Sequence, residues 1–237
     1  MSEDTRLNLL LLFYICLSLI GLFTVLMFAL KAPTQIENIA WRKPLIGSIF
    51  ASICIAGSIA TLFPKRCSGL FNLQKRENSK ISHGKISKLY GTVRGHHIEC
   101  EKFSTHTLQI QGTIVCAGCT GLLLGAMMAL SGTILYFFSD WKPGLAYFPM
   151  VLIGITGIIL GFIQLKFRGF LRLVLNTFFV LGAYLIIVAL DNLAKNIFID
   201  FYLIGLIILW ICTRIFISQW DHSRICRSCK LNCEHVL

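Results

Sequence analysis

The chain has 237 residues, of which 56% are hydrophobic and only 14% are charged, and its formal net charge is +11. A soluble globular domain carries about 25% charged residues, so this composition excludes a disordered chain and argues against an ordinary soluble enzyme. It is typical of a multi-pass membrane protein.

Six stretches are apolar over the roughly 20 residues that a membrane-spanning helix needs. In chain order they cover residues 7–31, 44–64, 113–138, 145–165, 170–190 and 197–218. The first is longer than the apolar part of a signal peptide, and Glu3 and Asp4 stand where such a peptide has basic residues. We therefore expect it to be a retained helix.

Lysine and arginine are distributed unevenly over the connecting segments. Most of the 22 fall on the side of the N-terminus, above all in segment 65–112 and in the C-terminal tail. The positive-inside rule therefore predicts a cell-membrane protein with both termini and the 65–112 loop in the cytoplasm.

The predicted spans contain small residues and few charges. Gly121 and Gly125 have the spacing of a helix contact in lipid. Asp191 and Asp200 are expected at outer helix ends, and the absence of a buried carboxylate argues against a proton-coupled pump. Arg214 lies inside the cytoplasmic end of the last span, where it either reaches out to the interface or faces the bundle and holds a lipid phosphate or a substrate anion.

Two short segments on the predicted cytoplasmic side hold most of the ten cysteines and six histidines. Their candidate metal ligands are His96, His97, Cys100, His106, Cys116 and Cys119 in the first, and Cys226, Cys229, Cys233 and His235 in the second. Cytosolic thiols stay reduced, so paired cysteines there indicate metal binding rather than disulfides. Zinc takes four Cys and His ligands, and the candidates are numerous enough for two sites. An iron–sulfur cluster is the alternative cofactor, because three cysteines of the second segment lie close together.

The pair Cys116-x2-Cys119 comes directly before the third predicted span, where helix N-terminal amides stabilise thiolates. We expect Cys100, Cys116 and Cys119 to bind one zinc, together with a histidine from His96, His97 or His106. The C-terminal tail is expected to dock beside the 96–119 segment through its own metal ligands.

Segment 65–94 is strongly basic and is expected to attract anionic lipid headgroups. It has no aromatic or recognition-helix pattern, so no nucleic-acid partner is expected. The chain shows no phosphate-binding glycine loop, nucleophile elbow or paired catalytic carboxylates, and whether it is an enzyme stays open.

Residues 95–121 read GHHIECEKFSTHTLQIQGTIVCAGCTG. This segment resembles an uncharacterised group of archaeal membrane proteins with the pattern Gly-His-His-x2-Cys-x2-Phe-x2-His, then Cys-x-Gly-Cys-x-Gly. It is more loosely similar to a prokaryotic membrane domain of unknown function that carries Cys-His, then Cys-Ala-Arg-Cys-Thr-Gly, and later a Gln and an Arg. That resemblance implies matching roles for Gln164 and Arg172, while Gly118 replaces the domain's arginine. It implies a prokaryotic plasma membrane but no activity.

The predicted fold is an all-α membrane protein, a bundle of six transmembrane helices with a small cytoplasmic Cys/His metal-binding cap. Residues 1–64 form two helices, 65–112 the basic loop, 113–218 four helices, and 219–237 the Cys/His-rich tail. The favoured function is a zinc-stabilised scaffold or interaction protein with a protein partner at the cap. A metal-dependent membrane enzyme or redox protein, and a transporter or metal-sensing carrier, stay open because the surplus of ligands permits both closed and open metal sites.

Overall fold

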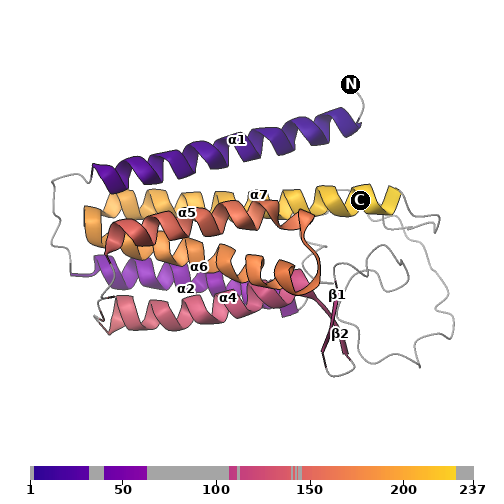
Figure 1. Cartoon of the computed structure of the whole chain (residues 1–237). Coiled ribbons are helices and arrows are strands. Elements are labelled where there is room, and N and C mark those ends of the chain that lie inside the picture. The colour runs from indigo at the N-terminus through magenta and orange to yellow at the C-terminus, as the bar shows by residue number, and fades with distance from the viewer. Residues whose placement is uncertain are drawn as a thin grey trace, which may run out of the picture.

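The computed structural model describes residues 3–31, 40–62, 107–110, 113–139, 141, 143 and 146–227, and the structural statements below concern these residues. Its helices are α1 (Glu3–Leu30), α2 (Arg42–Leu62), α4 (Ala117–Thr133), α5 (Tyr147–Ile163), α6 (Gly169–Ala194) and α7 (Ile197–Arg227). A π-helical turn, η2 (Ile134–Phe138), extends α4, and a 3-10 turn, η3 (Gln164–Lys166), follows α5. A two-stranded hairpin, β1 (Thr107–Ile110) and β2 (Thr113–Cys116), precedes α4 (Figure 1).

Six helices are long and apolar enough to cross a membrane, which agrees with the predicted multi-pass architecture. Most helix boundaries differ from the prediction by a few residues, and two of the differences have a clear physical cause. The helix expected from residue 113 begins only at Ala117, because the β-branched run Thr113–Val115 pairs as a strand. The last helix continues to Arg227 rather than ending at 218, since hydropathy marks only the apolar part of a helix.

Helix α6 lies at the centre of the bundle and packs closely against α4 and α5. A Cβ atom added to Gly121 of α4 would lie 2.2 Å from the carbonyl oxygen of Leu173, and one added to Gly157 of α5 would lie 2.6 Å from that of Phe178. Only glycine permits such close approach of two backbones. The prediction that Gly121 marks a helix contact is therefore confirmed.

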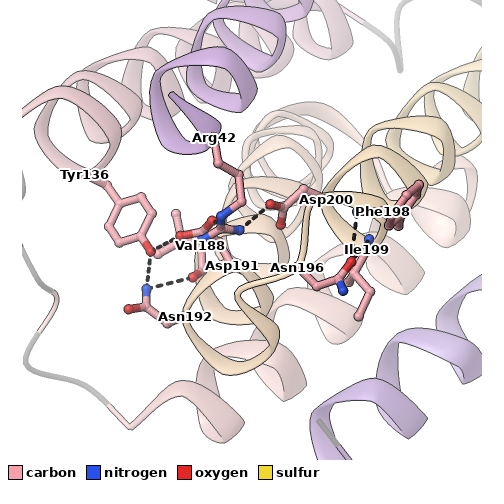
Figure 2. Close-up of polar contacts among 9 residues, drawn as sticks. All are labelled: Arg42, Tyr136, Val188, Asp191, Asn192, Asn196, Phe198, Ile199 and Asp200. Atoms are coloured by element: carbon pink, nitrogen blue, oxygen red, sulfur yellow. Dashed lines mark hydrogen bonds and ion pairs between the residues drawn. The ribbon is translucent and has the colours of Figure 1, made fainter. Parts of the chain in front are cut away.

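One end of the bundle is closed by a buried ion cluster (Figure 2). Arg42, the first residue of α2, lies 2.7 Å from Asp191 Oδ1 through its Nη1 atom, and the same nitrogen pairs with Asp200. Tyr136 of η2 donates a hydrogen bond to Asp191, and Asn192 donates one to the Tyr136 hydroxyl. These contacts join α2, the end of α4, α6 and α7.

This cluster corrects one sequence-based expectation. Asp191 and Asp200 are fully buried, and Arg42, which comes just before the predicted second span, is 4% exposed. The argument that the spans lack a buried carboxylate was therefore wrong, and the case against a proton-coupled pump loses that support. The cluster could not be predicted from the sequence, because its residues come from helices that are far apart in the chain.

At the opposite end of the bundle, the hairpin, the start of α6 and the end of α7 come together (Figure 1). The N-terminal part of α1 is there too, because Trp220 Nε1 of α7 donates a hydrogen bond to Asn8 Oδ1 at 2.9 Å. Both ends of the described chain thus share one end of the bundle, as the predicted topology requires. Which side of the membrane this end faces stays a prediction.

Candidate functional site

The candidate site is the cysteine pair at the start of α4. Strand β2 pairs antiparallel with β1, with Thr107 opposite Cys116. Cys116 ends the strand and is also the N-cap residue of α4, with φ −74° and ψ 118°. Cys119 follows in the first turn of the helix. The cysteine pair was expected to come before the helix, but its second member is part of the helix.

Three polar side chains from other helices meet this first turn. A Cβ atom added to Gly118 would lie 3.6 Å from Arg214 Nη2, 3.8 Å from Asn176 Nδ2 and 4.0 Å from Arg172 Nε. A long basic side chain at position 118 would therefore run into two guanidinium groups. Glycine at this position leaves room for both arginines beside the cysteines.

Arg214 is turned into the bundle rather than out to the interface. Its Nε donates a hydrogen bond to Asn176 Oδ1 at 3.0 Å, and its Nη2 donates a second one to the same oxygen. Asn176 Nδ2 in turn donates to the backbone oxygen of Arg172 at 2.6 Å. Within the described part of the chain Arg214 forms no ion pair with a carboxylate, whereas Arg172 interacts electrostatically with Asp221. Of the two interpretations of Arg214, the bundle-facing one is supported.

The surroundings of Cys116 favour its thiolate. The thiol of Cys119 donates a hydrogen bond to the Cys116 sulfur and, despite the cost of burial, lowers the pKa of Cys116 to about 5. The amides of Cys119 and Gly118 and the charge of Arg172 lower this pKa further, although the side chain makes no full capping hydrogen bond. These contacts therefore favour the thiolate of Cys116, which is the form that binds metals and attacks electrophiles.

The structure places only part of the predicted metal ligands. The side chains of Cys116 and Cys119 are described and lie together, and Cys226 lies in the last turn of α7, where only the backbone is described. Outside the described residues are His96, His97, Cys100, His106, Cys229, Cys233 and His235. Among the residues that are described, no group of three His, Cys, Asp or Glu residues is placed to hold a metal. The complete metal-binding cap, the basic loop and the docking of the tail all remain predictions.

Sequence reasoning missed Asn176 as a partner of the site. Arg172 and Asn176 are four residues apart, so they share one face of an otherwise apolar helix, and this was the available signal. Gln164, which the looser resemblance pairs with Arg172, is fully buried in η3. Neither its Oε1 nor its Nε2 has a hydrogen-bond partner within the described residues.

No family model, curated protein or solved structure matches this chain.

Proposed function

We propose that this chain is a multi-pass membrane protein that binds zinc at Cys116 and Cys119 and uses the metal to hold a cap that serves as a scaffold or interaction surface. The observation that carries the proposal is the position of the two cysteines within one helical turn, where Cys116 is favoured as a thiolate. Two thiolates at this spacing form half of a tetrahedral zinc site.

The register of the hairpin supports the proposal that the remaining zinc ligands come from the segment before β1. Thr107 lies opposite Cys116, and paired residues of an antiparallel ladder have Cα atoms about 4.5–5.5 Å apart. His106 is bonded directly to Thr107, and consecutive Cα atoms are about 3.8 Å apart. His106 and Cys100 are therefore the nearest candidates in sequence to complete the site, with His96 and His97 a few residues further.

The charges around the pair also support a thiolate-rich site. Zinc with three thiolates, from Cys100, Cys116 and Cys119, and one neutral histidine carries a net charge of about −1. Arg172 and Arg214 together with Asp221 supply an opposite net charge. The arginines therefore offset a negative metal centre that would be costly at a partly buried position.

A second site is proposed at Cys226, Cys229, Cys233 and His235, because α7 carries Cys226 to the end of the bundle where α4 begins. Zinc is the favoured metal there, and an iron–sulfur cluster is the alternative. We place both termini in the cytoplasm, the basic loop against anionic headgroups and a protein partner at the cap. A metal-dependent enzyme and a carrier are the alternative functions.

Elemental analysis of the purified protein tests this proposal. We expect zinc in the wild-type protein and the loss of about one equivalent in the Cys116→Ser/Cys119→Ser variant. The matched control is Cys16→Ala/Cys212→Ala, which removes two cysteines inside the spans and should leave the zinc content unchanged. Equal zinc in the double serine variant and the wild type would refute the assignment. Iron with visible absorption would instead favour the iron–sulfur alternative.

A further inference from the structure

A buried asparagine holds one of the two arginines beside the cysteine pair. We propose that Asn176 is a positioning residue for the zinc site. It keeps Arg214 beside Cys116 and Cys119 and, because its amide is neutral, leaves the positive charge of Arg214 to stabilise the metal centre. This role rests on the proposed function and deepens it, because the metal is zinc at the same two cysteines.

The hydrogen bonds around Asn176 fix its side chain in one position. Asn176 is fully buried, and its Oδ1 atom accepts two hydrogen bonds from Arg214, one from Nε at 3.0 Å and one from Nη2. Its Nδ2 atom donates a hydrogen bond to the backbone oxygen of Arg172, one turn earlier in α6, at 2.6 Å. Because both ends of the amide are bonded, the side chain cannot turn without the loss of a buried hydrogen bond. Asn176 therefore links α6 to α7 and fixes the direction of the Arg214 side chain.

This direction brings the guanidinium group of Arg214 to the cysteine pair. Its Nη2 atom lies 3.6 Å from the position that a Cβ atom of Gly118 would take, and Gly118 directly precedes Cys119. Cys116 is the N-cap residue of the same first turn of α4. A metal bound to the two cysteines would therefore have this positive charge as a close neighbour.

The charges of the two arginines are not equally available to a metal centre. Arg172 interacts electrostatically with Asp221, which offsets its charge. Arg214 forms no ion pair with a carboxylate among the described residues, and the group that accepts its hydrogen bonds is an uncharged amide. Arg214 therefore supplies the net positive charge beside the cysteines. Opposite charges attract more strongly in a partly buried site than in water, so this charge favours thiolates bound to zinc.

The neutral amide at position 176 is the feature that a purely structural role does not require. An aspartate there would also accept hydrogen bonds from Arg214, and it would hold the guanidinium group more strongly because of its charge. It would at the same time cancel the charge of Arg214, so that the zinc centre would lie beside a neutral ion pair. A residue that only joined α6 to α7 could be either, whereas a residue that leaves the Arg214 charge to zinc must be neutral.

The test measures the zinc affinity of the full-length protein in detergent. Metal is removed with a chelator, and zinc is then titrated in competition with a chromophoric chelator. We expect Asn176→Asp to bind zinc at least about tenfold more weakly than the wild type, as is typical for groups that act through the ligands of a metal. Arg214→Gln should lose a similar factor, and Arg214→Lys should keep part of the affinity because it keeps the charge.

Asn196→Asp is the matched control. It makes the same exchange at the N-cap of α7, at the other end of the bundle, where the side-chain oxygen accepts hydrogen bonds from the amides of Phe198 and Ile199. Aspartate caps a helix as well as asparagine does, so the zinc affinity of this variant should equal that of the wild type.

Thermal unfolding of the metal-free variants shows which of them are folded. Wild-type zinc affinity in folded Asn176→Asp or in folded Arg214→Gln would overturn the inference and leave the proposed zinc site intact. An equal loss of affinity in Arg214→Lys and Arg214→Gln would also overturn it, because the charge would then have no effect. A wild-type protein that binds no zinc, or that binds it equally well without Cys116 and Cys119, would refute the proposed function and the inference together.

Discussion

At the scale of single residues, Cys116 and Cys119 differ in role although they lie within one helical turn. Cys116 accepts the hydrogen bond that Cys119 donates, and it also lies by the first amides of α4. One cysteine is therefore the anionic member of the pair and the other its proton donor. This asymmetry gives a prediction that zinc-free protein can test.

We predict that alkylation of Cys116 by iodoacetamide in chelator-treated protein changes little between pH 8 and pH 6. The rate should fall only near pH 5, because the lowered pKa of Cys116, about 5, keeps the reactive thiolate populated down to that value. Cys119→Ala removes the donor and should shift the midpoint upward, toward the ordinary value of about 8.5. Peptide mass spectrometry measures the rates, and a wild-type midpoint near that ordinary value would contradict the assigned hydrogen bond.

Arg42 is the second residue on which the structure depends, because its guanidinium group pairs with both Asp191 and Asp200 in the buried cluster. Arg42→Met would remove this positive charge from two buried carboxylates, at a cost of about 3–5 kcal/mol. Thermal unfolding in detergent should show a large loss of stability, and Arg168→Met, at an exposed arginine, should show almost none. Adding Asp191→Asn and Asp200→Asn to Arg42→Met should restore part of the loss. Equal unfolding of Arg42→Met and the control would show that the cluster does not hold this end of the bundle.

At the scale of elements, the close contact between α4 and α6 depends on glycine residues, which have no side chain. Gly121→Ala would place a Cβ 2.2 Å from the Leu173 carbonyl oxygen, so the two helices must move apart. We expect a loss of about 1–3 kcal/mol or more, as for overpacked cores. Gly57→Ala is the matched control, because nothing lies within 4 Å of its Cβ position. If both variants unfold at the same temperature, α4 and α6 do not pack as the structure has them.

The membrane spans and one helix contact were predictable from the sequence, whereas the hairpin and the polar side chains around the cysteines were not. The six spans and the contact at Gly121 follow from local hydropathy and small-residue spacing, and both were predicted. The hairpin was not predicted, because hydropathy alone cannot tell whether Thr113–Val115 starts a helix or forms a strand. Its pairing with β1 decides for the strand. The cysteines were predicted as a site, but the polar side chains that lie beside them were not. Arg172, Asn176 and Arg214 lie on two other helices, and only packing brings them to Gly118.

At the scale of the whole molecule, the bundle has two different polar ends. One holds the buried cluster around Arg42, and the other holds the cysteine pair, the hairpin and both ends of the described chain. Since each predicted span joins one end to the other, the two ends face opposite sides of the membrane in the predicted topology. The charge distribution predicts that the cysteine end faces the cytoplasm.

Reporter fusions test this orientation. Fusions at the N-terminus and the C-terminus should both report a cytoplasmic location, and one inserted after Trp141 should report the outside, because that residue follows the end of η2. Termini on opposite sides would contradict the even number of spans. Both termini outside would keep the fold but remove the argument that the thiols are held reduced.

Zinc X-ray absorption of the purified protein tests directly whether zinc binds to Cys116 and Cys119. We expect sulfur ligands at about 2.3 Å from zinc together with nitrogen at about 2.0–2.1 Å. In Cys116→Ser/Cys119→Ser the sulfur signal should fall, or the zinc should be lost altogether. A zinc shell made only of nitrogen and oxygen in the wild type, or a sulfur signal unchanged in the double variant, would contradict it.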